Sequence, residues 1–276
     1  MNALVSLIKR HPFASFVILT YLFSWWPVLL YVWGMSPIGV AGYGPFLAAL
    51  VVLAVTAGKP GLKRLLWRIV HWRVGWQWYL LAFGLPLLMA GLASYLTVLL
   101  GAPAPSAEQL AAWPAIGVVF LMRMLIPGLG GTWEEPGWRG YAVHQLEQKR
   151  TRLSALLPLW IIIVIWHIPL FLTGGAEWVD ILNMVAGVII YNWLYHRSGN
   201  SVLLVMIIHS MNNAVSGEFF SPMFTGVYAV QQAWMRTLVW SVVAVIVLVV
   251  EWRWWTQHEE SHPVGQEAAL EPVASH

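Results

Sequence analysis

Two long stretches of this chain, residues 11–58 and 74–107, contain no Asp, Glu, Lys or Arg. Only 10% of the 276 residues are charged, whereas about 25% are charged in an average soluble domain. A soluble fold of this size could not cover its surface with so few charged side chains. Runs of about 20 apolar residues are instead the length that crosses a bilayer. The sequence therefore predicts a membrane protein and excludes a cytosolic enzyme.

Eight apolar runs are candidates for transmembrane segments. Helices are the expected spanning element, because a helix satisfies its own backbone hydrogen bonds in lipid. The predicted fold class is an all-α membrane protein, a polytopic bundle of about eight transmembrane helices. The candidate spans are Phe13–Gly34, Ile38–Ala57, Trp76–Leu100, Pro114–Leu129, Ser154–Leu172, Val179–Tyr195, Ser201–Ser216 and Arg236–Trp254.

The Lys and Arg residues gather in alternate connecting segments. If the N-terminus is cytoplasmic, nearly all of them lie in the inner segments, which are 1–12, 58–75, 130–153, 196–200 and the tail after Trp254. The outer segments contain none of them, and these are 35–37, 101–113, 173–178 and 217–235. Cytoplasmic loops carry such an excess of basic residues. The pattern predicts a multi-pass protein of the cytoplasmic membrane with both termini in the cytoplasm, and it assigns the basic charge to the lipid bilayer rather than to nucleic acid.

The basic segment between the second and third runs is amphipathic near residues 61–73. Lys63 and Arg68 fall on one helical face, and Leu62 and Leu65 fall on the other. Such a pattern is typical of a helix that lies in the membrane interface. A plain basic loop is the alternative interpretation.

The chain has one predicted domain. It comprises residues 1–256, with a site region at 133–214. Residues 257–276 are polar, and we predict a disordered cytoplasmic tail for them. The absence of cysteine excludes disulfides, thiolate metal sites and a Cys nucleophile.

Two adjacent glutamates follow the fourth run, in the segment Trp133-Glu134-Glu135-Pro136-Gly137-Trp138-Arg139. Two neighbouring carboxylates in a site of low dielectric raise the pKa of one of them, which suits a general base near neutral pH. Glu135 and Arg139 are four residues apart, so a helix that begins at Pro136 would pair them and leave Glu134 for chemistry. The alternative without a catalytic role is a solvated salt bridge in a loop.

Polar residues also interrupt two of the predicted spans. His167 lies within the fifth span, and His209 and Asn213 lie one helical turn apart in the seventh. Each of them alone could be a hydrogen-bonding group between helices. An ionisable side chain inside a bundle is costly, however, and together with Glu134 these groups satisfy one another if they share one cavity. They would then supply a base, polarising groups and an oxyanion donor for hydrolysis.

The motifs Glu134-Glu135-x-x-x-Arg139, His167 and His209-x-x-x-Asn213, in this order on a multi-spanning chain, resemble the CPBP family. This family comprises the CAAX proteases and the bacteriocin-processing enzymes of Abi type. One position departs from the family pattern, because Ile163 stands where the second motif usually has Phe. The resemblance covers roughly residues 133–214, and its Abi-like form indicates a bacterial source.

The resemblance implies an intramembrane endopeptidase that cleaves a membrane-associated or lipidated peptide or protein. It implies that Glu134 activates a water molecule with the help of His167, and that Glu135 and Arg139 support the site. His209 and Asn213 would stabilise the oxyanion. We expect this site to open toward the cytoplasm.

Two mechanisms stay open. Glu134, His167 and His209 could hold Zn²⁺ and leave a position for water, although the His-Glu-x-x-His spacing of zinc proteases is absent. A metal-free reaction with Glu134 as the only base is equally compatible with the sequence. Two functions from other classes are a proton-coupled transporter, which would use the same buried groups as a relay, and a bacteriocin-immunity or peptide-sequestering membrane protein without catalysis. The sequence leaves the substrate and the oligomeric state open.

Overall fold

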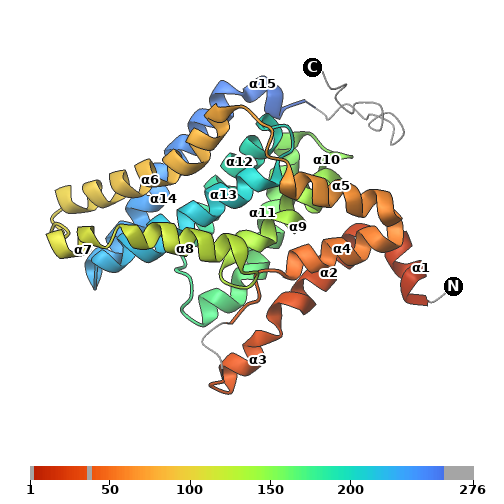
Figure 1. Cartoon of the computed structure of the whole chain (residues 1–276), viewed down its shortest axis with the longest axis horizontal. Coiled ribbons are helices and arrows are strands. Elements are labelled where there is room, and N and C mark those ends of the chain that lie inside the picture. Colours follow the sequence, from red (N-terminus) through yellow and green to blue (C-terminus); the bar gives the residue numbers. More distant parts are fainter. Residues whose placement is uncertain (1–2, 36–38, 258–276) are drawn as a thin grey trace.

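The computed structural model describes residues 3–35 and 39–257, and helices account for nearly all of the regular structure there (Figure 1). These residues form no β-strand, so the predicted all-α fold class is confirmed. In the first half of the chain the helices are α1 (Ala3–Arg10), α2 (Pro12–Trp25), α3 (Pro27–Val32), α4 (Gly44–Thr56), α5 (Gly58–Val70), α6 (Trp76–Leu99), α7 (Ala107–Ala111) and α8 (Pro114–Leu125).

The second half contains short helical pieces as well as long helices. The segments η1 and η4 are 3₁₀ helices, and η2 and η3 are π-helices. The elements are η1 (Gly131–Glu134), α9 (Glu135–Gly137), η2 (Trp138–Ala142), α10 (Val143–Glu147), α11 (Arg152–Leu172), α12 (Asp180–Arg197), α13 (Val202–Asn212), η3 (Asn213–Phe220), η4 (Ser221–Met223), α14 (Val227–Val250) and α15 (Trp252–Trp255).

Five helical segments in the described residues are long and apolar enough to cross a membrane, which bears out a membrane protein but not the number eight. They are Pro12–Val32, Trp76–Leu99, Arg152–Leu172, Val202–Met223 and Val227–Val250. Of the other three predicted spans, α4 has 13 residues and α8 has 12. At 1.5 Å per residue these helices are only about 18–20 Å long, which is shorter than the hydrocarbon core of about 30 Å. The third is α12, whose 18 residues include Asp180 and Arg197.

Helix α13 is the central helix of the bundle. Of the span that it begins, 67% is buried inside the protein, compared with 28% for the span of α14. Its sequence explains this position, because the run Val202-Leu203-Leu204-Val205-Met206-Ile207-Ile208 is apolar on every face. Ser201 begins the helix, since its side chain accepts a hydrogen bond from the Leu204 amide. The packing of α13 against its neighbours places His209 in the middle of the protein.

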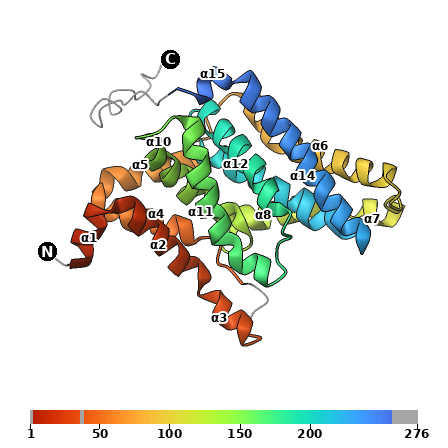
Figure 2. The ribbon, with the colours of Figure 1, turned by 180° about the vertical axis from the view of Figure 1, so that it is seen from behind.

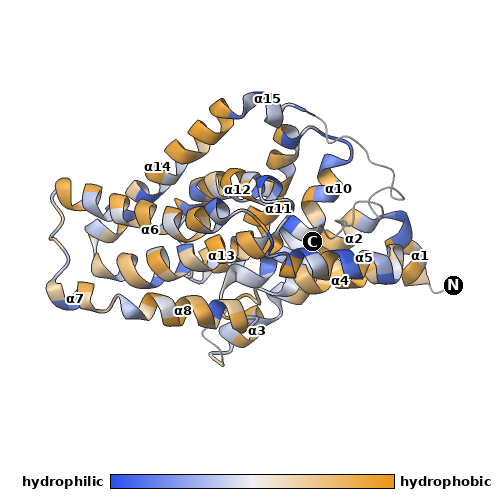
Figure 3. Cartoon of the chain, turned by 45° about the horizontal axis from the view of Figure 1, so that its top comes forward, coloured by the Kyte–Doolittle hydropathy of each residue, from blue (hydrophilic) through white to orange (hydrophobic). Residues whose placement is uncertain are grey.

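The helices share two ends, and most basic residues lie at one of them, which we call the basic end. Here the guanidinium groups of Arg152 and Arg197 lie 4.7 and 5.0 Å from the ring of Trp254, and the Ser201 hydroxyl donates to the His71 carbonyl. Figures 1 and 2 show α5, α10 and α15 on this side of the molecule. In the hydropathy colouring of Figure 3, these three helices carry hydrophilic residues, whereas α14 is mostly hydrophobic.

We call the other end of the bundle the opposite end. The Tyr31 hydroxyl donates to the Thr173 carbonyl at 3.2 Å, which joins α3 to the loop after α11. The Gln231 amide donates to the Leu100 carbonyl at 3.4 Å, which joins the beginning of α14 to the end of α6. Helices α11 and α6 therefore run from the basic end to the opposite end, and α12 and α14 run back.

The predicted interfacial helix near residues 61–73 corresponds to α5, which is displaced by about one turn toward the N-terminus. Leu65 is buried against the bundle, and the Arg68 guanidinium donates to the Gly140 carbonyl. Most of the predicted tail, residues 258–276, lies outside the described residues, as does Ile38 at the beginning of the second predicted span.

Candidate functional site

A glycine-rich turn leads into the two glutamates. Gly128 and Gly130 have φ angles of +100° and +86°, which only glycine adopts readily. A Cβ atom on Gly131 would lie 2.4 Å from Oε1 of Glu134 and 3.0 Å from Nε2 of His209. The backbone therefore approaches the ionisable groups so closely that a side chain at 131 has no room.

The glutamates begin a nearly continuous helical run from η1 to α10, whose middle part, η2, is wound as a π-helix. Pro136 is near the helix start, where its missing N–H costs nothing. The π-helix is wider than an α-helix and is often found at functional sites. It places Trp138 and Arg139 beside the two glutamates, with both side chains buried.

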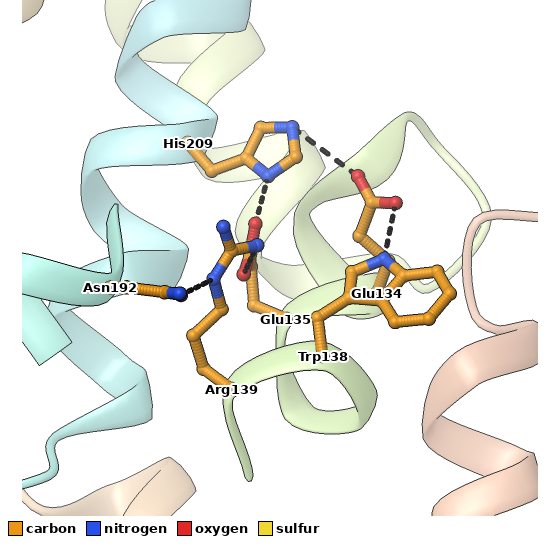
Figure 4. Close-up of polar contacts among 6 residues, drawn as sticks. All are labelled: Glu134, Glu135, Trp138, Arg139, Asn192 and His209. Carbon is orange, nitrogen blue, oxygen red and sulfur yellow. Dashed lines mark hydrogen bonds and ion pairs between the residues drawn. The ribbon is translucent and has the colours of Figure 1, made fainter. Parts of the chain in front are cut away.

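Glu135 is held by two partners, as Figure 4 shows. Its Oε2 accepts a hydrogen bond of 2.7 Å from Nη1 of Arg139, and its Oε1 lies 2.6 Å from Nδ1 of His209. Nε of Arg139 also donates to Oδ1 of Asn192 at 3.1 Å. The predicted pair of Glu135 and Arg139 is thus confirmed, with side chains only 1% and 3% exposed. Both carboxylate oxygens of Glu135 are engaged, so this residue fixes the ring of His209.

Glu134 has a different environment. Its Oε2 accepts a hydrogen bond of 2.9 Å from Nε1 of Trp138, and its Oε1 lies 3.6 Å from Nε2 of His209 (Figure 4). Burial and the neighbouring charge of Glu135 raise the pKa of Glu134 from 4.5 to about 7, although His209, Trp138 and Arg139 act in the other direction. The carboxyl group of Glu134 is therefore able to take up and release a proton near neutral pH.

One cavity of about 820 Å³ collects all six of the predicted site residues. The lining includes Glu134, Glu135, Arg139, His167, His209 and Asn213. Nδ1 of His167 lies 2.8 Å from the Ile163 carbonyl oxygen, which can only accept, so Nδ1 carries the hydrogen and Nε2 is an acceptor. Asn213 begins the π-helix η3, one turn beyond His209.

The donor atoms that come closest together differ from the predicted metal set of Glu134, His167 and His209. Within the described residues, the group that could hold an ion is Glu134, Glu135 and His209, whose ligand atoms lie within 4.8 Å of one another. His167 is not part of this group. Because Glu135 is already paired with Arg139 and with Nδ1 of His209, the atoms left to face an ion are those of Glu134 and Nε2 of His209.

Three participants in the site were not predicted from the sequence. Trp138 holds Glu134, Asn192 holds Arg139, and the ring of Tyr191 lies 5.4 Å from the Arg139 guanidinium. Trp138 is four residues after Glu134 on the same helical run, so its spacing was a usable signal. Asn192 lies on α12, and its one local signal is that it is a polar residue in an apolar helix.

Two comparisons with known proteins found similar sequences. Residues 113–215 match the model of the family described as type II CAAX prenyl endopeptidase Rce1-like. This region is therefore similar to the CAAX proteases. Over 111 residues the chain is also 28% identical to the CAAX prenyl protease 2 of Methanococcus maripaludis. That alignment covers 36% of this chain and 39% of the relative, so the chain matches well under half of the relative's length.

Proposed function

We propose that this chain is an intramembrane endopeptidase in which Glu134 is the general base. The observation that carries the proposal is the unequal state of the two glutamates. Glu135 is fixed by Arg139 and His209, whereas Oε1 of Glu134 faces Nε2 of His209 across the cavity at 3.6 Å. The match of residues 113–215 to a family of CAAX endopeptidases supports a protease in general.

The reaction follows from these positions. Ionised Glu134 takes a proton from a water molecule in the cavity, and the water oxygen attacks the carbonyl carbon of the scissile peptide bond. The resulting oxyanion accepts hydrogen bonds from His209 and Asn213. Glu134 then passes the proton to the amide nitrogen as the C–N bond breaks, which gives a carboxylic acid and an amine. His167 offers its Nε2 to orient the water.

A divalent ion such as Zn²⁺ fits part of this site. Glu134 and His209 would hold it, because a carboxylate oxygen and an imidazole nitrogen are usual zinc ligands. When bound, such an ion would lower the pKa of a water ligand and polarise the substrate carbonyl. With such an ion bound, Glu134 and Nε2 of His209 would be its ligands, so the steps above describe the metal-free reaction.

The proposed substrate is a membrane-associated or lipidated peptide or protein. The burial of Glu134 inside a helical membrane protein supports this, and so does the name of the relative from Methanococcus maripaludis, a CAAX prenyl protease. A peptide-sequestering or immunity protein and a proton-coupled transporter would use the same groups without cleaving a bond.

The test is cleavage of a fluorogenic peptide library by the purified protein in detergent. Glu134→Gln keeps the size of the side chain and removes the base, so the cleavage rate should fall by about 10²–10⁴-fold. Glu108→Gln changes an exposed acid of α7 and serves as the control, because it should cleave like the wild type. Equal cleavage by Glu134→Gln and the wild type would refute the proposal. Proton flux in liposomes without cleavage of any peptide would favour the transporter.

A further inference from the structure

The part of the chain that forms α1 to α6 contains basic residues but no acidic ones. The first acidic residue is Glu108, so the basic side chains before it have no carboxylate from the same part of the chain to pair with. Within the described residues, Lys59 and Lys63 of α5 take part in no ion pair. The basic residues before Glu108 are Lys9, Arg10, Lys59, Lys63, Arg64, Arg68 and Arg73. Their excess of positive charge favours an anionic partner from outside the chain.

Helix α5 is held at the level where the protein enters the membrane. Gly58 has a φ angle of +59° and turns the chain from α4 into α5. After α5, the spanning helix α6 begins at Trp76. Trp72 and Trp76 are 62% and 75% exposed, and exposed tryptophans mark the interface between hydrocarbon and water. The helix therefore lies beside the lipid headgroups at the basic end.

One face of α5 packs on the protein. Leu65 is only 1% exposed, and its Cδ1 would lie 2.4 Å from a Cβ atom on Gly140. Nη1 of Arg68 donates a hydrogen bond of 3.2 Å to the Gly140 carbonyl. Gly61 is also buried. These contacts fix the rotation of α5 about its axis, so its other face points away from the protein.

The outward face of α5 combines lysines with apolar side chains. Its positions recur every three or four residues, which places them on one side of the helix. They are Lys59, Lys63, Leu66, Trp67 and Val70, and all of them are exposed. The lysines lie in the half of α5 near α4, and the apolar residues lie in the half near α6. A flexible lysine can reach a lipid headgroup while the apolar side chains enter the hydrocarbon beneath it.

Helix α1 extends this surface. Leu4 and Leu7 are exposed, whereas Ile8 is buried, and α1 packs on α4. Lys9 and Arg10 are exposed at the C-terminal end of α1. Figures 1 and 2 show α1 next to the turn between α4 and α5. We call the outward face of α5, together with Leu4, Leu7, Lys9 and Arg10, the α1–α5 surface.

We propose that the α1–α5 surface binds phospholipids with an anionic headgroup in the leaflet at the basic end. Lys59 and Lys63 contact the headgroup phosphates, and Leu66 and Trp67 contact the upper part of the acyl chains. A zwitterionic headgroup carries a positive group that offsets its phosphate, so it is bound less well. One Lys near an anionic membrane surface contributes a preference of about fivefold, and two contribute about 25-fold. The inference does not depend on the proposed function, because α5 does not line the cavity.

The absence of native cysteine allows a bimane fluorophore to be attached at one position. Leu66→Cys carries it on the outward face of α5, and Leu99→Cys carries it at the exposed end of α6 near the opposite end of the bundle. Each labelled protein is placed in nanodiscs of phosphatidylcholine that contain a small fraction of brominated lipid, either phosphatidylglycerol or phosphatidylcholine. Bromine quenches a fluorophore that it contacts, so the ratio of the two quenching efficiencies measures the preference for the anionic lipid at that position.

We expect brominated phosphatidylglycerol to quench more strongly than brominated phosphatidylcholine at position 66 and equally at position 99. Lys59→Gln combined with Lys63→Gln should lower the preference at position 66 by about 25-fold, and Lys63→Gln alone by about fivefold. The control combines Lys149→Gln with Arg150→Gln, which removes the same charge from exposed residues elsewhere at the basic end and should leave the preference unchanged.

Equal quenching by the two lipids at position 66 would overturn the inference. An equal preference at positions 66 and 99 would also overturn it, and so would an equal loss in the two double variants, because the attraction would then belong to the whole protein rather than to the α1–α5 surface.

Discussion

Replacement of Arg139 tests whether the buried ion pair holds the site together. In Arg139→Met, Glu135 keeps its contact with His209 but loses its guanidinium partner, and Asn192 loses a donor. The two side chains of the pair are only 3% and 1% exposed. Removing one partner of such a buried pair costs about 3–5 kcal/mol of unfolding free energy. At about 1.4 kcal/mol for each factor of ten, the ratio of folded to unfolded protein should fall by about 10²-fold to about 4 × 10³-fold.

The assay is thermal melting of the purified protein in detergent, together with peptide cleavage. Arg139→Met should melt well below the wild type and should be inactive, whereas Arg150→Met, at an exposed site of the basic end, should do neither. The double variant Glu135→Gln with Arg139→Met should recover part of the lost stability, because no unpaired carboxylate is then buried. If Arg139→Met melted like Arg150→Met, the reasoning about the pair would be wrong.

The other predictions concern the proton, the turn and the metal. The pKa of Glu134 is raised from 4.5 to about 7, mainly by burial, so the cleavage rate should increase as the pH rises through about 7. Stability that is present at low pH should decrease as the pH rises from 4.5 to about 7, because the folded state holds the proton of Glu134 over this range. Trp138→Phe removes a hydrogen bond that stabilises the ionised form, so the midpoint of the rate profile should move to higher pH; an unchanged midpoint would show that this bond does not tune Glu134. Gly131→Ala should abolish activity by displacing Glu134 and His209, whereas Gly117→Ala, with no atom near the added methyl group, should not; equal activity of the two would contradict the close approach. Dialysis against a strong chelator, followed by metal analysis and assay, separates the two mechanisms, since a metal-free reaction keeps its full rate and a metal-dependent one loses it until Zn²⁺ is restored.

The sequence predicted where apolar helices lie better than where they end. The sequence predicts one span over Pro114–Leu129, but α8 ends at Leu125 because Pro127 disfavours a helical conformation before it and Gly128 turns the chain. In the described part of the predicted span Ile38–Ala57, the helix begins at Gly44, and Pro45 occupies its first turn. Hydrophobicity persists through both breaks, so an average over a window does not detect them.

The candidate site could be predicted to the extent that it is local. Glu135 and Arg139 are four residues apart, so helical geometry alone indicated their contact. The bond between Glu135 and His209 joins residues 74 positions apart, and it depends on how α13 packs on α9. No sequence pattern predicts a contact between two residues so far apart in the chain. For the same reason the sequence did not indicate the contact of Asn192 with Arg139.

The π-helix η2 has a consequence for insertions and deletions. A π-turn amounts to one extra residue within an α-helix, and each residue turns an α-helix by about 100°. Deleting one residue from Trp138–Ala142 would let the segment rewind as an ordinary helix, but everything after it would swing around the axis. Glu147, which bonds His196 at 3.1 Å, and Glu135 could then no longer both reach their partners. The π-helix η2 thus sets the rotation about the helix axis that both polar contacts need, and chains with a shortened η2 should lose one of them.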